Sequence, residues 1–397
     1  MLRFAFSPTS DIDIRDLRVA LLNYIVSCQK NEEFIVRIED MDKDKGIDDK
    51  DKENLGILDL FGIKYSQTIY QSENIRFHTA MALQLIHEKK AFSCFCSPEW
   101  LATKKAEAKT NNQPYKYDDA CANLPAELVI DNTNPFTVRV RRATEDTESF
   151  IIMQQDKRPT YDFSCAIDDM LSDISIIVCK ENYRENIEKQ DYIRTTLQYD
   201  KQIQYIYLPT IMSDDAVSVK WLLEEGFLPE AISNYLISMG LDEAIKDLDI
   251  NDLSPLPFRF DVEMLKNINQ KYLKMLNAKE LSRYVGFADE EIGELAKIYL
   301  EDISTTKELK AKIALIFAPK NIPEEFSKQS ELIIKIIKEA PYFDQYDGFQ
   351  NHIMEKSGLN GDELLKTLSL VLTGSSNGVD LVKIYKYIKN YIGEIVK

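Results

Sequence analysis

The chain has 397 residues, more than one core usually holds, so we expect two to four domains. Apolar residues make up 44% and charged residues 29%, close to the globular average, and no apolar run approaches the roughly 18 residues that a membrane span needs. The formal net charge of −17 disfavours non-specific binding to a polyanion such as DNA but leaves room for a local basic surface.

The N-terminal segment predicts a strand, a helix and a second strand. Met1–Pro8 contains no long apolar stretch followed by a cleavage site, so no secretory signal is visible and we expect a cytoplasmic location. Leu2–Phe6 and Phe34–Ile38 are short runs typical of strands, and residues 16–30 carry a helical apolar repeat. Because parallel strands need a crossover element, this order predicts a doubly wound α/β sheet with ligands at the carboxyl ends of its strands.

The later elements predict an insertion in this sheet and then an all-helical region. From about 76 to 149 the pattern changes to short helices, turns and a group of cysteines, and strand-like segments resume at Ser149–Met153 and Ile174–Val178. Beyond about 216 nearly every segment reads as helix, for example Ser218–Glu225, Pro229–Met239, Val262–Leu276 and Leu364–Leu372. We therefore assign residues 1–75 and 150–215 to a split core and residues 76–149 to the insertion.

The insertion contains closely spaced cysteines. Cys94 and Cys96 are followed by Tyr117 and then by Cys121. Thiolates grouped in this way are typical of zinc sites, in which two short segments supply four tetrahedral ligands. Three cysteines are one ligand short, so Tyr117, the pair Asp118–Asp119 or water would complete the site. Spacing alone does not separate this hypothesis from ordinary reduced cysteines in a small insertion.

Eight strings in the sequence carry a family resemblance. They are Arg3–Thr9, Arg37–Asp40, Tyr70–Ser72, Cys94–Cys96, Arg158–Tyr161, Ile167–Ile174, Glu225–Ala231 and Leu372–Gly374 with Gly378. In order and approximate spacing the chain resembles bacterial glutamyl-tRNA synthetases from end to end. The resemblance implies a class I synthetase with an α/β Rossmann-type catalytic core, a zinc-site insertion and all-helical domains after it.

The resemblance also implies an amino-acid pocket. The four positions that contact glutamate in the family are Arg3, Ser7, Glu39 and Tyr161, and all four residue types are kept. The chemistry fits, because a guanidinium binds a carboxylate in a bidentate manner and Glu39 can accept the substrate ammonium group. An alternative is that Arg3 and Glu39, on adjacent central strands, form a buried structural ion pair.

Two further assignments follow from the resemblance. The family zinc site matches Cys94, Cys96, Tyr117 and Cys121 in an insertion that contacts the acceptor arm of tRNA, which favours zinc at this position. Residues 216–255 correspond to a helical stem-contact region, and residues 256–397 correspond to a helical domain that resembles the anticodon-binding domain.

The first ATP-binding signature of the family is degenerate in this chain. Where the family has His-Ile-Gly after the first strand, the sequence has Asp13, Ile14 and Arg15, followed by Asp16. The family histidine stabilises the phosphates and the glycine lets the adenine approach the backbone. An anionic Asp13 would repel a triphosphate, and Arg15 would fill the space of the nucleotide.

The second signature, Lys-x-Ser-Lys, is missing. Only a short segment separates Leu208 and Pro209 from the helix that begins near Ser218. This part of the sequence contains no Lys or Arg between Lys201 and Lys220. The cationic clamp on the transferring phosphates therefore has no local substitute. In addition, Cys179 replaces an arginine that lines the family active site.

These changes predict a pseudo-synthetase. Its expected partners are a tRNA of the glutamate or glutamine type, free glutamate, or an intact synthetase paralogue. We expect it to bind neither a membrane nor DNA. Zinc is the expected cofactor, whereas ATP and Mg²⁺ are not expected. The alternative is a weakly active or atypical glutamate–tRNA ligase in which Arg15, Arg18 or Lys180 replaces the missing cations. A third hypothesis is transfer of glutamate that has been activated elsewhere to another acceptor.

Overall fold

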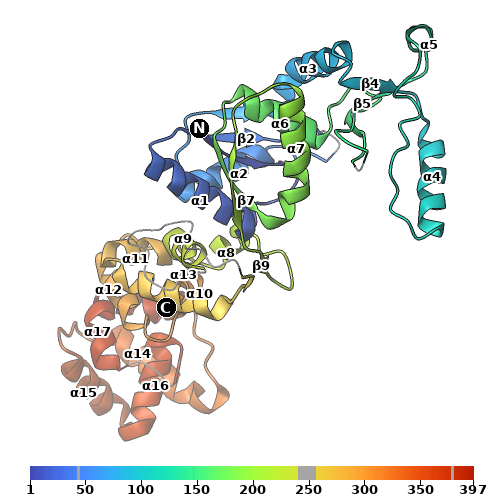
Figure 1. The fold of residues 1–397 in the computed structure, drawn as a ribbon. Helices are drawn as coiled ribbons and strands as arrows, with labels where there is room; N and C mark the ends of the chain where they lie inside the picture. The colour runs from blue at the N-terminus through green and yellow to red at the C-terminus, as the bar shows by residue number, and fades with distance from the viewer. Residues whose placement is uncertain (43–44, 146, 240–255, 377–379) are drawn as a thin grey trace. The chain divides into compact units, whose positions relative to one another are not determined.

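The structure, a computed structural model, describes residues 1–42, 45–145, 147–239, 256–376 and 380–397 (Figure 1). Gly378 and residues 240–255 of the predicted stem-contact region lie outside the described residues. The chain forms two compact units. The first unit consists of Met1–Ala216 with Ile237–Arg259, and the second unit consists of Val217–Leu236 with Phe260–Lys397. Among the described helices, none combines the length and the apolar character needed to cross a membrane.

A five-stranded parallel sheet forms the centre of the first unit, so the predicted α/β core is confirmed. Its strand order is β3-β2-β1-β7-β8. The strands are β1 (Leu2–Phe6), β2 (Phe34–Ile38), β3 (Thr68–Tyr70), β7 (Ile176–Lys180) and β8 (Gln204–Leu208). The strands β1 and β2 have the predicted bounds, whereas β7 begins two residues later than the pattern indicated.

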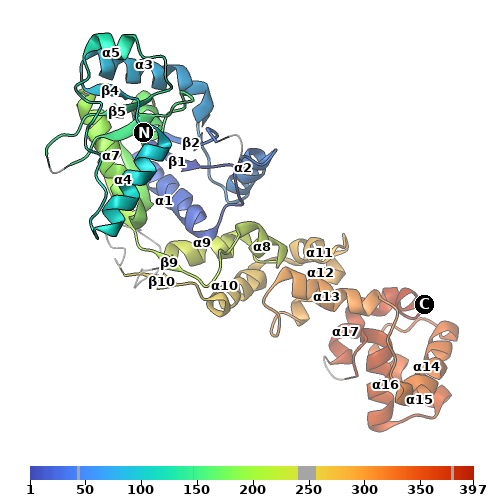
Figure 2. The same ribbon diagram turned by 90° about the vertical axis from the view of Figure 1, so that its right-hand side faces the viewer.

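Helices connect these strands as the doubly wound pattern requires. They are α1 (Ile14–Lys30), α2 (Lys50–Leu60), α6 (Tyr161–Leu171) and α7 (Arg184–Thr196), with the short 3₁₀ helix η2 (Glu181–Tyr183) before α7. The helix α1 buries an apolar stripe that includes Leu17 and Leu21 and packs against β1, β2 and β7 (Figure 2). It begins two residues before the predicted start because Asp13 caps its first turn.

The insertion contributes to a small antiparallel sheet whose core is shared with α6 and α7. Its strands, in the order β4-β5-β6, are β4 (Ala91–Cys94), β5 (Thr137–Val140) and β6 (Phe150–Met153). The strand β6 pairs with β5 and not with the parallel sheet, although the sequence assigned residues 150–153 to the split core. The helical segments are η1 (Gln71–Asn74), α3 (Ile75–His87), α4 (Pro98–Thr110) and α5 (Ala126–Ile130). A satellite cluster of Phe92, Cys94, Tyr117 and Ala122 lies apart from the main core.

The second unit is helical throughout its described part, apart from short turns and loops. It begins with α8 (Val219–Glu224) and α9 (Pro229–Ser238), whose last residues belong to the first unit. The strands β9 (Ile211–Met212) and β10 (Phe258–Arg259) pair with each other in the first unit. The later segments are α10 (Val262–Met275), α11 (Ala278–Val285), α12 (Glu290–Ile298), α13 (Thr306–Phe317), η4 (Glu324–Phe326), α14 (Ser327–Glu339), α15 (Tyr346–Ser357), α16 (Gly361–Thr373), α17 (Leu381–Ile388), η5 (Lys389–Tyr391) and α18 (Ile392–Ile395).

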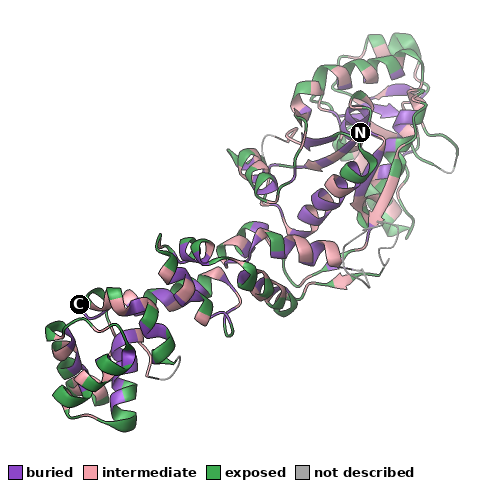
Figure 3. Cartoon of the chain, turned by 90° about the vertical axis from the view of Figure 1, so that its left-hand side faces the viewer, coloured by how far each residue is buried: buried purple, intermediate pink, exposed green. Residues whose placement is uncertain are grey.

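The turn between α8 and α9 requires a glycine. Gly226 has a φ of +86°, and a Cβ built on it would lie 2.4 Å from the backbone nitrogen of Lys307. Its carbonyl oxygen accepts a hydrogen bond from the backbone N–H of Thr306 at 3.0 Å. Because a side chain fits neither the backbone conformation nor the space, this turn fixes α13 against the start of the second unit. Each of these helices has buried positions on one side, as the burial colouring shows (Figure 3), and the second unit has one large cluster of buried apolar residues.

A buried ion cluster joins the parallel sheet to α6. Side chains alternate along strands, so Arg3 of β1 and Arg37 of β2 lie on the same face of the sheet. Both bind Asp169 of α6: Arg3 Nε lies 2.8 Å from Oδ1, Arg3 Nη2 lies 3.1 Å from Oδ2, and Arg37 Nη1 lies 2.6 Å from Oδ1. Arg37 Nη2 also donates to Glu39 at 3.1 Å. The partner of Arg3 is therefore Asp169 and not Glu39, which was the pair considered from sequence.

The charges in this cluster keep Asp169 ionised. Burial alone would raise the pKa of its carboxyl group, but the positive charges of Arg3 and then Arg37 outweigh that effect and hold the pKa at about 2. The Asp169 side chain is fully buried, and the Arg37 side chain is 3% exposed. Removing the carboxylate would leave buried guanidinium groups without compensation, which is far more costly than losing an exposed pair.

We predict that Asp169→Asn lowers the free energy of unfolding by about 3 to 5 kcal/mol at pH 7, as breaking a buried ion pair does. The folded pKa of Asp169 is below that of the unfolded chain, so its contribution is present above about pH 4 and is lost as the pH falls through the folded pKa of about 2. Urea unfolding between pH 2 and pH 7 measures both effects.

The matched control is Asp173→Asn, just after α6. Asp173 forms an exposed pair with Lys201, and its left-handed backbone, with a φ of 51°, suits asparagine. We expect this change to cost less than about 1 kcal/mol, as is usual for exposed pairs. Equal losses in the two variants would contradict the assignment of Asp169 as the central charge of the unit.

Candidate functional site

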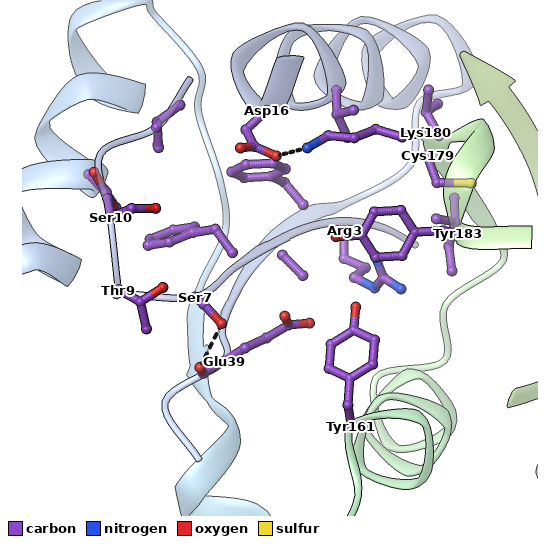
Figure 4. Close-up of a pocket in the computed structure, with 18 of the residues that line it drawn as sticks. Arg3, Ser7, Thr9, Ser10, Asp16, Glu39, Tyr161, Cys179, Lys180 and Tyr183 are labelled. Carbon is purple, nitrogen blue, oxygen red and sulfur yellow. Dashed lines mark hydrogen bonds and ion pairs between the residues drawn. The ribbon is translucent and has the colours of Figure 1, made fainter. Parts of the chain in front are cut away.

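A cavity of about 310 Å³ lies at the carboxyl ends of β1, β2 and β7, where the strand order of the sheet reverses (Figure 4). Ligands of doubly wound sheets bind at this position. The four predicted amino-acid contacts, Arg3, Ser7, Glu39 and Tyr161, all line the cavity. The structure thus brings together four residues that are far apart in the sequence.

The ends of two strands and one helix position these side chains. Ser7 follows β1, and its hydroxyl donates to the carbonyl oxygen of Glu39 at 3.2 Å. Glu39 follows β2, and its backbone N–H donates to the carbonyl oxygen of Phe6 at 2.9 Å, which continues the sheet ladder. Tyr161 is the first residue of α6, and its hydroxyl points towards Arg3 (Figure 4). Donors and acceptors therefore face one another across the cavity.

Arg3 presents one nitrogen to the cavity. Asp169 takes Nε and Nη2 of its guanidinium group, which leaves Nη1 for a ligand. Beside it lie Tyr183 and Cys179 (Figure 4). Burial raises the pKa of the Cys179 thiol to about 11, so this side chain is neutral at pH 7 and supplies no charge where the family has an arginine.

Sequence reasoning missed Tyr183 of this wall and the role of Asp169 beneath it. Asp169 lies in the string used for the resemblance, yet no local pattern reveals that it binds Arg3. Lys180, considered from the sequence as a substitute cation, ends β7 and forms an ion pair with Asp16 at 2.5 Å. Tyr183 lies in η2, and its position just after a strand of the central sheet was the available signal.

The N-terminus of α1 is capped by the chain itself. Asp13 Oδ1 accepts from the backbone N–H groups of Arg15 at 2.8 Å and Asp16 at 2.9 Å. The side chain of Arg15 returns to Asp13, with Nε 2.7 Å from Oδ2. Asp13 and Arg15 line a second cavity of about 190 Å³, together with Arg18 and Lys180. The backbone donors at which anions commonly bind are thus used internally.

The segment that replaces the second signature is short. After β8 the chain enters β9, and Ser218 then caps α8 by accepting from the backbone N–H of Trp221. Through the pairing of β9 with β10, Arg259 reaches Asp214 and binds both of its carboxylate oxygens at 2.9 Å. The sequence analysis missed this cation because Arg259 lies 45 residues away from Asp214.

The predicted metal ligands come together in the insertion. The sulfur atoms of Cys94, Cys96 and Cys121 all lie within 4.8 Å of one another. The Tyr117 hydroxyl is 3.2 Å from Cys94 Sγ and 3.5 Å from Cys96 Sγ. Three thiols and one phenol oxygen are a donor set that fits tetrahedral zinc. The guanidinium group of Arg139 lies 3.8 Å from the centre of the Tyr117 ring and holds the tyrosine in place.

Comparisons with known proteins agree with this geometry. Residues 1–271 match the family profile "tRNA synthetases class I (E and Q), catalytic domain". The chain is 55% identical to "Glutamate--tRNA ligase 2" of Sulfurimonas denitrificans and 42% identical to "Glutamate--tRNA ligase 1" of a Nitratiruptor species, over the full length of both proteins in each case. The alignments span 432 positions against the 397 residues of this chain.

The fold matches a solved structure over nearly the whole chain. A glutamate tRNA ligase from Elizabethkingia meningosepticum, in complex with its amino acid, superimposes with a TM-score of 0.77 at 20% identity. The match covers 99% of this chain and 98% of the solved one. The profile over the catalytic core and the full-length identity to named ligases establish that this chain belongs to the glutamyl-tRNA synthetase family of class I synthetases.

Proposed function

We propose that this family member is a catalytically inactive pseudo-synthetase, which binds tRNA, glutamate or an intact synthetase without forming an aminoacyl adenylate. The observation that carries this proposal is the cap of α1. Asp13 occupies the backbone donors of the helix N-terminus and is itself held by Arg15. A triphosphate would have to displace a carboxylate that is fixed by hydrogen bonds and would meet its negative charge.

The missing second signature supports the same conclusion. Arg259, a cation that the fold brings near this segment, is already paired with Asp214. Removing one group that stabilises transition-state charge typically costs about two orders of magnitude in rate, so losing several leaves little catalysis. The full-length alignments exceed this chain by 35 positions, which is consistent with deleted segments. We therefore expect no productive binding of ATP and Mg²⁺.

An RNA partner is supported by the surface of the insertion. In a chain with a net charge of −17, Lys104 and Lys116 line one hollow together with Tyr115 and Asp118. Lys105 Nζ lies 5.8 Å from the centre of the Tyr115 ring. Cations beside a partly exposed aromatic ring suit RNA, whose phosphates and unstacked bases bind these two groups. The names of the relatives indicate that the RNA is a tRNA, and we assign it to the glutamate or glutamine type.

The alternative is an active, weak or atypical glutamate–tRNA ligase. It is favoured by the relatives, which are named as ligases, and by the four retained amino-acid contacts. The cations nominated for this role are already engaged in the chain. Arg15 binds Asp13, Lys180 binds Asp16, and Arg18 donates to the carbonyl oxygen of Met239 at 2.7 Å. Transfer of glutamate that was activated elsewhere would need only the amino-acid cavity.

We predict that the purified protein catalyses no glutamate-dependent exchange between pyrophosphate and ATP, with or without tRNA, because the phosphate-binding groups are absent or occupied. Calorimetry with ATP, in the presence and absence of glutamate, should give no binding heat. Exchange well above a blank without enzyme would favour the active ligase instead.

A variant tests the physical cause. Asp13→Asn keeps a capping oxygen but removes the charge, so it should bind inorganic triphosphate roughly tenfold more tightly than the wild type does. The matched control is Asp261→Asn, because Asp261 caps α10 through the corresponding two backbone N–H groups, those of Glu263 and Met264. An Asp13 variant with unchanged triphosphate binding would argue against the capping carboxylate as the barrier.

We also predict that the insertion binds about one zinc ion per chain through its tetrahedral donor set. Cys121→Ser should lose the metal and lower the melting temperature, whereas Cys28→Ser, which alters an exposed cysteine on α1, should change neither. Metal analysis after dialysis and thermal denaturation measure these effects. Tyr117→Phe tests the fourth ligand, since retention of full affinity would assign that position to water or to an aspartate.

A further inference from the structure

The cations in the wall of the amino-acid cavity are already neutralised. Among the described residues that line it, the side chains of the Arg and Lys type are Arg3 and Lys180. Arg3 is bound by the buried carboxylate of Asp169, and Lys180 Nζ lies 2.5 Å from Asp16 Oδ1. In the layer beneath, Arg37 is shared between Asp169 and Glu39. Arg194 lies 3.9 Å from Asp169 and is paired with Asp191, and Asp11 of the wall is paired with Lys50, so each of these cations faces a carboxylate.

Few ligating atoms remain for a small molecule. Asp169 leaves Arg3 Nη1, and Arg37 engages Oε1 of Glu39 and leaves Oε2. The hydroxyl of Tyr161 faces Arg3, and Tyr183 lies beside it (Figure 4). Glu39 Oε2 is suited to a ligand ammonium group. Arg3 Nη1 and Tyr161 are suited to an oxygen of the ligand side chain, so the described wall retains no cation for a second carboxylate.

The charges of free glutamate do not complement the already paired charges of the cavity wall. At neutral pH it carries two carboxylates and one ammonium group, so binding would place an extra negative charge in a cavity whose cations are engaged. Burying a carboxylate without a partner is costly. When the α-carboxyl group is esterified, the same amino acid has one carboxylate, one ammonium group and no net charge. Such a ligand needs only the atoms that the wall offers.

An adjoining cavity provides space for the alcohol part of an ester. This cavity has a volume of about 240 Å³ and shares Ser7, Glu39 and Tyr161 with the amino-acid cavity. Its further lining includes Gln71, Gln154, the apolar Met41 and Pro159, and Arg158, whose guanidinium group is paired with Asp156 at 2.6 Å. A ligand that continues beyond its α-carboxyl group can thus pass from one cavity into the other between these three side chains.

We propose that the amino-acid cavity selects an amino acid whose α-carboxyl group is esterified, namely the glutamyl end of an RNA that has already been charged, over the free amino acid. This inference rests on the proposed function, in which the protein binds a substrate or product of the family reaction without carrying out activation. The ligand is then received from a glutamate-charging ligase, and no bond is made or broken in this cavity.

Calorimetry at pH 7 with three small probes tests the proposal: L-glutamate, its α-amide and its γ-amide, L-glutamine. The α-amide serves as a stable substitute for the ester. It should bind at least about tenfold more tightly than glutamate, because an unpaired buried carboxylate is lost, and more tightly than glutamine. Equal or tighter binding of glutamate, tighter binding of glutamine, or no binding of the α-amide at millimolar concentration would each overturn the proposal.

A variant links the preference to the paired cations. Asp16→Asn releases the Lys180 ammonium group from its carboxylate, so glutamate binding should strengthen and the preference for the α-amide should shrink by about tenfold. The control is Glu294→Gln on α12, which removes one partner of an exposed pair with Lys297 and should leave the ratio unchanged. An unchanged ratio in the Asp16 variant, with an unchanged melting temperature, would contradict the role assigned to the ion pairs.

The two proposals fail in different experiments. The probe titrations contain no ATP, so glutamate and its α-amide binding equally, with pyrophosphate exchange still absent, would overturn only the selection for an esterified ligand. Pyrophosphate exchange in the wild type would overturn the proposed function, whatever ratio the probes give.

Discussion

The first unit depends on one buried carboxylate, that of Asp169. Two neighbouring strands each direct a guanidinium group, from Arg3 and Arg37, at the same face of the sheet, and α6 supplies the charge that allows both to be buried there. Without that charge the two cations would repel each other within the core. The same contact leaves a single nitrogen of Arg3 for a ligand. The carboxylate that stabilises the core therefore also determines which atom of Arg3 a ligand can bind.

The two neighbouring cavities differ in how their groups are used. The groups of the amino-acid cavity line an open space, whereas Asp13 and Arg15 at the start of α1 satisfy each other. An acidic N-cap is favourable for a helix, because it accepts backbone hydrogen bonds and interacts well with the helix dipole, together about 1 kcal/mol or more. Replacing the phosphate-binding histidine by Asp13 therefore stabilises α1 locally. Under the proposed loss of ATP binding, this change would add stability at no cost to function.

The sequence predicted the parts of the fold that local patterns encode. The strands Leu2–Phe6 and Phe34–Ile38 were located to the residue because apolar and β-branched runs are local signals. The start of α1 was missed because Asp13 was interpreted only as a broken signature and not also as an N-cap. The partner of Arg3 was missed because it comes from α6, 166 residues away. Contacts of this kind depend on the packing of a helix on the sheet, and no spacing rule encodes them.

The segment that carries the cysteines is held together separately from the start of α1. Its satellite core around the cysteines has four buried members, Phe92, Cys94, Tyr117 and Ala122, which is too little apolar area to hold the segment by itself. A metal ion bound by three thiolates would supply the missing stability, whether or not ATP binds elsewhere. The lysines of α4 are attached to this small core and not to the start of α1. Loss of the phosphate site therefore leaves the proposed RNA surface intact.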